Sequence, residues 1–251
     1  MLLTRRQQIS AVLEPADSPE YQGRTLWQEA KMRFVRNKSA MLGMYVLVFL
    51  LVVSFATLVI DLSTAGSIYK DYVVKQNIEN KLLEPCLEHI FGCDEYGRDI
   101  LIRMVWGIRY SLSMGMASIL FATFIGGLIG AVSGFHGGIL DNVLMRIMDI
   151  LLAIPYMLLA IAIASALNSG LVNLALSIGI PEIPGFARIM RAQVMTVKDR
   201  DFVEAGRASG ASSARILIKY IIPNCFAPII VQFSLSVANA ILNIAGLSFI
   251  G

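Results

Sequence analysis

Charged side chains are scarce in this sequence. They make up 16% of its 251 residues, whereas a typical soluble domain carries about 25%. Apolar residues account for 56% of the chain instead, and several apolar stretches reach the roughly 20 residues needed to cross a bilayer core. A soluble globular domain is therefore excluded. We expect an all-α polytopic membrane protein embedded in a lipid bilayer.

Residues that carry catalytic or metal-binding chemistry are also few. The two histidines, His89 and His136, lie far apart in segments predicted on opposite sides of the membrane, so they cannot form a metal pair. The serines of the apolar run 111–133 have no histidine base beside them, which leaves a nucleophilic triad unsupported. No GxxxxGK[ST] motif is present, so the chain lacks a phosphate-binding loop of its own. We expect no enzyme activity, no metal and no cofactor.

Three cysteines are too few for a disulfide framework. Cys86 and Cys93 fall in one charged segment and can pair in an oxidising compartment, but free thiols are favoured because no further pair suggests a covalent framework. Cys225 opens an apolar run, where we expect it to pack as a small hydrophobic residue.

Five apolar runs are long enough to span the membrane. Their approximate bounds are residues 41–60, 111–133, 143–167, 171–195 and 226–250. The third contains Pro155, which removes a backbone donor and is expected to kink its helix. The fourth is interrupted by Pro181, Pro184 and Gly185, and interrupted helices at membrane depth occur where they face protein or water. The fourth run is therefore the best candidate for lining a pore.

Two further features lie within these runs. Gly126 and Gly130 have the four-residue spacing that lets helix backbones approach closely in lipid, whereas the later glycines of the series are candidates for a turn. Arg146 and Asp149 lie one turn apart in the third run. Either they belong to a translocation path or gate, or they form an ion pair with each other and extend to the membrane–water interface. The second interpretation is favoured.

The charges are distributed unevenly. Residues 1–40 hold seven Lys/Arg and four Asp/Glu, the stretch from Asp61 to Arg109 holds six and eight, and that from Arg188 to Lys219 holds seven and three. Because Lys and Arg accumulate on the cytoplasmic side, we predict a cytoplasmic N-terminus, a cytoplasmic loop at 188–219 and an external segment at 61–108.

We divide the chain into three parts. Residues 1–40 form a cytoplasmic leader, in which 24–39 have the spacing of an amphipathic helix on the membrane surface. The alternative is a simple cytoplasmic extension of the first span. Residues 41–108 hold the first transmembrane helix, expected to remain uncleaved, and the external segment. Residues 109–251 form a core domain with a cytoplasmic loop at 193–224.

The loop has the pattern of a helix, a turn and a second helix. Its first part, VKDRDFVEAGRAS, has a helix-forming composition, and Gly210 can end that helix as a C′ residue. Ser212 or Ser213 can cap a second helix, ARILIKYII, which Pro223 is expected to terminate. Such a protruding elbow can fit a cleft on a soluble partner and transmit motion. The alternative is an unattached loop.

This loop resembles the EAA loop of ABC-importer permeases, E-A-A-x3-G-x9-I-x-L-P. Glu204, Ala205, Gly210 and Pro223 match in spacing, whereas Gly206 replaces the usual Ala, Tyr220 replaces Ile and Ile222 replaces Leu. The resemblance implies that this loop contacts an ATPase. The coupling residues it points to are Glu204, Ala205, Gly206, Gly210, Ala211, Ser212 and Pro223.

The resemblance covers nearly all of residues 23–251. FGCDEYGRDILIRMVWGIRYSLSMG (91–115) is similar to the FGTDxxGRDxxSRxxxGxRxSL signature of oligopeptide/dipeptide/nickel importer permeases, with Cys93 in place of Thr and Ile102 in place of Ser. Residues 144–164, 184–205 and 223–231 also resemble that family, and 23–40 are similar to the N-terminus of oligopeptide-permease C-type subunits. The signature residues are Asp94, Gly97, Arg98, Asp99, Arg146, Asp149, Pro155 and Arg188.

The resemblance implies a type I ABC-importer permease fold with six spans, of which five are expected here. The chain stops at GLSFIG, the first half of a GLSFLGLG motif, so we expect it to be truncated at the C-terminus. The implied assembly is a heterodimeric pore with a second permease subunit, two ABC ATPase subunits and an external solute-binding protein, without nucleic acid. Its implied location is a bacterial-type plasma (inner) membrane.

Peptides are the expected cargo by resemblance alone. Nickel or another small solute, or an inactive truncated subunit, are the alternatives. A further alternative, an ion-coupled secondary transporter, would favour ionisable residues at the midplane and an internal repeat, and the sequence shows neither.

Overall fold

The computed structural model describes residues 31–32, 34–168 and 170–250, and within these ranges the chain is helical without a β-strand. The expected all-α fold is confirmed. The predicted surface helix at 24–39 lies mostly outside the described residues. Contacts divide the chain into two units, residues 1–52 and 53–251, which are described separately.

The first unit contains the beginning of α3 (Lys38–Ser63), which covers the first expected span. Asn37 precedes the helix, and its side-chain oxygen accepts hydrogen bonds from the backbone N–H groups of Ser39 and Ala40 at 3.1 and 3.2 Å. These bonds satisfy donors that a helix start leaves free. The apolar side chains of this part of α3 are largely exposed, as a lipid-facing helix requires.

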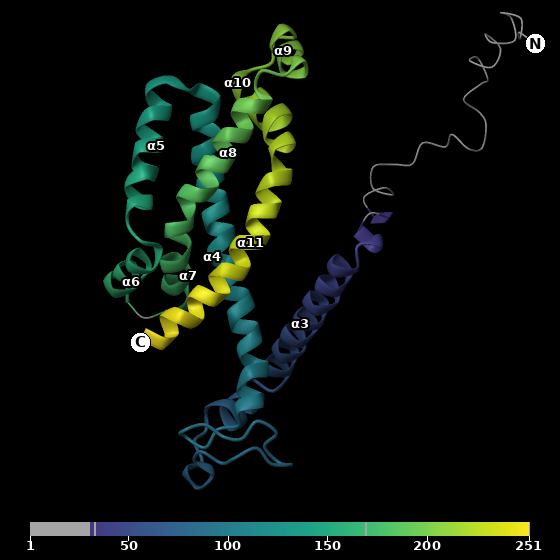
Figure 1. Cartoon of the computed structure of the whole chain (residues 1–251), viewed down its shortest axis with the longest axis vertical. Helices are drawn as coiled ribbons and strands as arrows, with labels where there is room; N and C mark the ends of the chain where they lie inside the picture. The colour runs from purple at the N-terminus through teal and green to yellow at the C-terminus, as the bar shows by residue number, and fades with distance from the viewer. Residues whose placement is uncertain (1–30, 33, 169, 251) are drawn as a thin grey trace, which may run out of the picture. The chain divides into compact units, whose positions relative to one another are not determined.

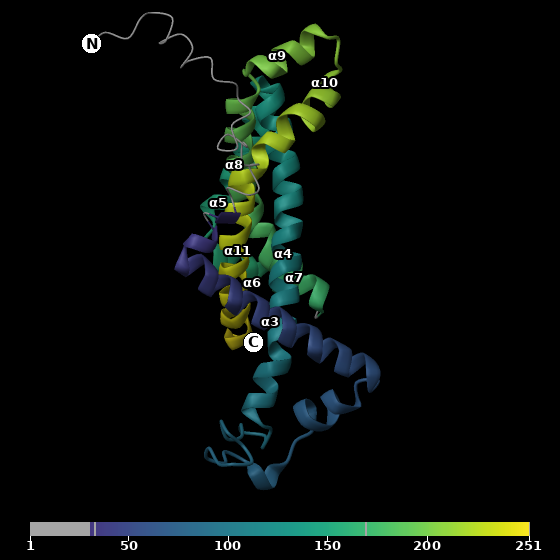
Figure 2. The same cartoon turned by 90° about the vertical axis from the view of Figure 1, so that its right-hand side faces the viewer.

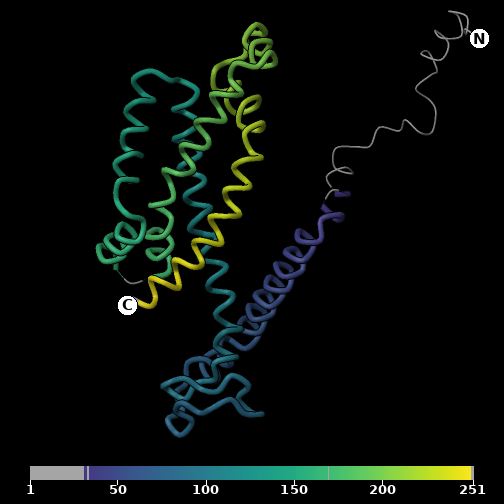
Figure 3. Tube along the Cα trace, viewed as in Figure 1, coloured from purple at the N-terminus to yellow at the C-terminus, as the bar shows by residue number. Residues whose placement is uncertain are grey.

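The second unit holds the end of α3 and the remaining elements (Figures 1 and 3). They are η2 (Tyr69–Val74), η3 (Ile78–Asn80), α4 (Ile100–His136), α5 (Gly138–Ala153), α6 (Tyr156–Ala166), α7 (Leu171–Gly179), η4 (Ile180–Glu182), α8 (Ile183–Val197), α9 (Asp201–Ala208), α10 (Ser213–Arg215), η5 (Ile216–Ile221) and α11 (Ile222–Ile250).

Three described helical stretches are long and apolar enough to cross a membrane: 38–63, 100–136 and 213–249. The helices α5 and α6 make a fourth if they are counted together, although they are bent by 93°, so the described residues hold up to four such spans where five were expected. The bend lies at Ile154 and Pro155, where the sequence predicted a kink. The fourth expected run is divided into α7, the 3-10 turn η4 and α8, so the predicted interruption is confirmed.

The helices α4 and α8 pack backbone against backbone. A Cβ atom added at Gly126 would lie 2.5 Å from the carbonyl oxygen of Ile183, and one at Gly130 would lie 2.2 Å from that of Ala187. The predicted helix contact at these two glycines is confirmed. Gly134 extends it, since its added Cβ would lie 2.8 Å from the Arg191 carbonyl oxygen. Only glycine allows this approach along one face of α4.

The level of η4 along α4 follows from the contacts on either side of it. On one side, a Cβ added at Gly179 would lie 2.7 Å from the carbonyl oxygen of Ser118. On the other side is the contact between Gly126 and Ile183. The break therefore lies beside residues 118–126, in the middle of the 37-residue helix α4.

We predict that Gly130→Ala separates α4 from α8 and lowers the thermal stability of the purified chain in detergent, at a cost of about 1–3 kcal/mol for overpacking. Gly127→Ala is the matched control, because the nearest atom to its added Cβ is the Met190 Cε at 3.8 Å, an ordinary contact. Equal melting temperatures for the two variants would contradict the proposed role of Gly130.

Candidate functional site

The elbow, residues 201–215, has the predicted helix–turn–helix form and projects beyond the ends of α8 and α11 (Figure 2). The helix α9 ends at Ala208, and Gly210 adopts a left-handed φ of +78° while its N–H donates to the Arg207 carbonyl at 2.9 Å. Ser212 caps α10 by accepting a hydrogen bond from the Arg215 N–H at 3.4 Å. Both turn residues therefore act as the sequence predicted.

The helix α9 has one buried face and one free face. Val203 and Gly206 are buried, whereas Glu204 and Ala205 are exposed and Ala211 is half-buried in the turn. The short helix is thus held to the protein by one side and presents Glu204 and Ala205 outward. An exposed helical face of this kind is available to a partner.

Gly206 and Tyr220, two of the departures from the EAA pattern, lie against each other. A Cβ added at Gly206 would lie 3.7 Å from the Tyr220 ring, so the ring covers the backbone where the usual alanine would place a methyl group. That distance is an ordinary van der Waals contact, and an alanine fits. The pairing fills the space beneath α9 with an aromatic side chain.

The prediction that Pro223 terminates the second helix is wrong. The helix continues from Ser213 to Phe249, and the six residues Ile216–Ile221 before the proline form a π-helix. Proline removes a backbone donor and crowds the preceding turn, and a π-helical turn absorbs this irregularity without ending the helix. Asn224 helps by donating its side-chain N–H to the Tyr220 carbonyl at 2.6 Å.

The signature residues Asp94, Gly97, Arg98 and Asp99 form one tight turn ahead of α4. Asp94 accepts hydrogen bonds from the backbone N–H groups of Tyr96 and Arg98 at 2.9 and 3.0 Å. It also accepts from the Arg98 Nε at 2.9 Å and from the Arg103 guanidinium. Gly97 has a φ of +70°, and a Cβ there would lie 1.6 Å from the Asn77 carbonyl oxygen, so glycine is required.

Asp99 caps α4 directly. One of its oxygens accepts the Ile102 N–H at 2.9 Å, and the other lies 2.8 Å from Nδ1 of His89. Cys93, at the position where the signature has Thr, is buried, and Cys86 and Cys93 are free thiols, as favoured from the sequence. The signature residues thus form the turn and the N-terminal cap from which α4 begins.

Electrostatics strengthen this turn. Burial opposes ionisation of Asp94, but the hydrogen bonds from Arg98 and Tyr96 outweigh it and lower the pKa of Asp94 to about 2. Burial likewise opposes ionisation of Asp99, and the hydrogen bonds from His89 and Ile102 lower its pKa below the usual value. Both carboxylates are therefore charged at neutral pH and bind their donors strongly.

The predicted pairing of Arg146 with Asp149 is wrong. Asp149 of α5 is bonded instead to Arg188 of α8, with Nη2 2.6 Å from Oδ1, and Arg146 is exposed. The bend at Pro155 and the packing of α5 beside α8 bring the two helices within reach, which intrahelical spacing alone cannot show. Both side chains are about half exposed, at 46% and 54%, so this pair lies on a surface of the chain.

Two ion pairs hold helices together without having been predicted. Asp141 of α5 accepts two bonds of 2.6 Å from Arg191 of α8 and one from Ser133 of α4. Lys198 donates to the Gly134 carbonyl at 3.3 Å nearby. Charged residues bordering apolar runs need partners, and that rule was the available signal for this cluster.

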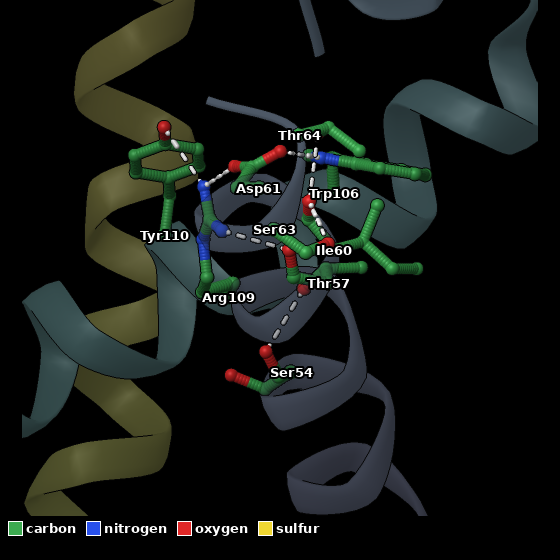
Figure 4. A network of polar contacts seen from close by, with 9 residues as sticks. All are labelled: Ser54, Thr57, Ile60, Asp61, Ser63, Thr64, Trp106, Arg109 and Tyr110. Carbon is green, nitrogen blue, oxygen red and sulfur yellow. Dashed lines mark hydrogen bonds and ion pairs between the residues drawn. The ribbon is translucent and has the colours of Figure 1, made fainter. Parts of the chain in front are cut away.

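The second pair joins α3 to α4 within the second unit (Figure 4). Arg109 donates to Asp61 at 2.6 Å and to the Thr57 carbonyl at 3.2 Å, and Trp106 donates to the other Asp61 oxygen at 3.1 Å. The Arg109 Cζ atom also lies over the Tyr110 ring, 4.8 Å from the ring centre. The network ties the end of the first span to the start of the second.

One carboxylate was missed in the middle of the bundle. The sequence analysis expects no ionisable residue at the midplane, whereas the structure places Glu182 of η4, only partly covered, beside the middle of α4. Its signal was the acidic residue between Pro181 and Pro184 in the interrupted run. Among the described residues, no group of three or more His, Cys, Asp or Glu could hold a metal ion.

We predict that Asp94→Asn speeds amide hydrogen exchange in the 92–100 turn by about tenfold or more, because charge-assisted bonds to Arg98 and Arg103 are lost. The exposed neighbour Glu95→Gln is the control. The lowered pKa of Asp94 determines the pH range of the effect. The turn should keep its protection from exchange above about pH 4 and lose it as the pH falls toward 2. Protection factors, corrected for the intrinsic pH dependence of exchange, that stay constant across this range would contradict the assignment.

For the elbow, Gly206→Ala should stabilise α9 by up to about 1 kcal/mol, because its methyl group meets the Tyr220 ring without overlap. Gly210→Ala should instead strain the turn by about 1–2 kcal/mol at its positive φ. Limited proteolysis of the elbow should therefore be slower in the first variant and faster in the second. The reverse order would show that the turn is built differently.

Known proteins match this chain over most of its length. Residues 126–251 match the family described as binding-protein-dependent transport system inner membrane component, and residues 25–85 match the N-terminal TM domain of oligopeptide transport permease C. The dipeptide transport system permease protein DppC of Alkalihalophilus pseudofirmus is 37% identical over 238 residues, which are 94% of this chain and 75% of that protein.

Two other relatives agree with this match. The oligopeptide transport system permease protein OppC of Bacillus subtilis is 36% identical over 230 residues, 90% of this chain and 72% of its own. The glutathione transport system permease protein GsiD of Escherichia coli is 36% identical over 255 residues, 100% of this chain and 80% of its own. The family resemblance of the motifs and the type I ABC permease fold are confirmed, and the chain belongs to the family of binding-protein-dependent transport system inner membrane components.

Proposed function

We propose that this chain is a transmembrane permease subunit of an ABC importer that moves peptides into the cell. The main support is that dipeptide and oligopeptide permeases align with 90% or more of this chain. Hydrolysis of ATP is assigned to separate ATPase subunits, and an external solute-binding protein delivers the cargo. The pore is a heterodimer with a second permease subunit, above two ATPases.

The orientation follows from charge. The Lys/Arg excess at 1–40 and 188–219 places the N-terminus and the elbow in the cytoplasm, and the acidic segment 61–108 outside. The elbow then faces the ATPases, and the turn around Asp94 faces the binding protein.

The elbow is the coupling element in this proposal. Its free face carries Glu204 and Ala205, while Val203 and Gly206 on the opposite face fix α9 to the helices that lead into the membrane. ATP binding closes the ATPase pair, α9 moves with it, and the bundle changes from inward-facing to outward-facing. The elbow must therefore bind the two ATPase states with different affinities.

The Asp149–Arg188 pair is the second element that we assign to transport. It lies about half exposed on the surface formed by α5 and α8, beside the interrupted α7–α8 segment. Charged groups in a membrane bundle face its interior or a water-filled cavity. We therefore place this surface toward the second permease subunit and the translocation path.

Glu204→Lys should abolish peptide uptake by the reconstituted importer, since it reverses the charge on the free face of α9 without touching the buried face. Membrane insertion and assembly of the two permeases should be unchanged. Asp71→Lys, at an exposed acid of η2 that lies outside the turn around Asp94, is the control and should retain uptake. Normal uptake by Glu204→Lys would rule out coupling through this face, and uptake of nickel in place of peptides would rule out the proposed cargo.

A further inference from the structure

Glu182 lies where a charge is costly. It ends the 3-10 turn η4, which lies beside residues 118–126 in the middle of α4, as the contacts of Gly179 and Gly126 show. A carboxylate at such depth in a membrane protein is expensive unless a partner compensates it, and it is by default a functional residue.

The described part of the chain provides Glu182 with little compensation. One oxygen accepts a hydrogen bond from the hydroxyl of Ser236 at 3.1 Å, and Ser236, which is 2% exposed, in turn accepts one from Gln232 at 3.1 Å. No Lys, Arg or His of the described residues lies within 4.0 Å of the carboxylate. A carboxylate offers about four acceptor positions, so most of its capacity is unused here.

Glu182 also borders a cavity. The space has a volume of about 340 Å³ and lies against the bend between α5 and α6. Its lining includes Ile154, Pro155 and Tyr156 from the bend and Pro181, Glu182 and Gly185 from the interrupted run. Glu182 is the only charged side chain in this lining, and the Tyr156 hydroxyl donates to the Ile178 carbonyl at 3.1 Å, so a solute here would meet mostly apolar walls and a single carboxylate.

The chemistry of this site favours an ammonium group. One carboxylate, oriented by a buried serine, complements a single positive charge with hydrogen-bond donors, whereas a transition metal ion needs several nitrogen or sulfur ligands. Every peptide with a free amino terminus carries such a charge regardless of its side chains. A single contact also leaves the solute free to move on.

We propose that Glu182 binds the amino-terminal ammonium group of a peptide as it passes through the bundle. This inference rests on the proposed function, because it names the chemical group of the peptide cargo that the path recognises. The neighbouring Asp149–Arg188 pair does not compete for the ammonium group, since its carboxylate is already bonded to a guanidinium. Glu182 is thus the carboxylate of this region that remains available for a cation.

The test uses the complete importer in proteoliposomes, with trialanine and N-acetyl-trialanine as probes. During turnover a carbodiimide activates the Glu182 carboxyl group, the peptide amine attacks it, an amide bond forms and the urea leaves. We expect mass spectrometry to find this adduct with trialanine, but not with the acetylated peptide. Glu182→Gln should abolish the adduct and reduce trialanine uptake about tenfold or more. Asp71→Asn, at an exposed acid of η2 outside the turn around Asp94, should change neither.

A link between Glu182 and a lysine of the second permease subunit would overturn the inference, because the partner would then supply the cation. Unchanged trialanine uptake in Glu182→Gln would also overturn it. The inference would likewise fail if Glu182→Gln reduced assembly of the importer and ATPase stimulation by the loaded binding protein as much as it reduced uptake. An importer with unmodified Glu182 that takes up no peptide contradicts the proposed function itself. If the importer takes up peptide and Glu182→Gln leaves that uptake unchanged, only this inference is contradicted.

Discussion

The backbone contact between α4 and α8 determines where both candidate sites lie. Gly126, Gly130 and Gly134 remove the side chains that would separate the two helices, and the helices therefore meet along three successive turns. This register sets η4, and with it Glu182, beside the middle of α4. It also directs the end of α8 toward the elbow. Apolar side chains provide no specific register in lipid, so the small residues must provide it.

Ion pairs add further contacts between helices to those that the glycines allow. Asp141 and Arg191 connect α5 to α8 at the end nearest the elbow, and Asp61 and Arg109 connect α3 to α4 at the opposite end of α4. Each pair uses several hydrogen bonds, as charges in low-dielectric surroundings require. Such pairs are weak evidence for added stability, but they specify which helices are neighbours. The two ends of α4 are thus fixed by charge and its middle by close packing.

Local patterns predicted a good part of this structure. The positions of four of the five expected spans, the bend at Pro155, the contact at Gly126 and Gly130 and the cap at Ser212 depend on nearest neighbours along the chain or on one helix face. Two of the errors have a common cause. Asp149 pairs with Arg188, and Glu182 lies beside the middle of α4, because of contacts between helices distant in sequence. Pro223 was misjudged because a π-helical turn has no simple sequence signal.

The helix that begins with α10 has a mechanical consequence. From Ser213 to Phe249 it is one continuous helix of 37 residues, with a π-helical segment next to the elbow and Pro228 inside α11. At 1.5 Å per residue such a helix is about 55 Å long, so a tilt of about 5° at one end displaces the other by roughly 5 Å. The chain therefore contains a lever, with its short arm at α9 and its long arm in the bundle.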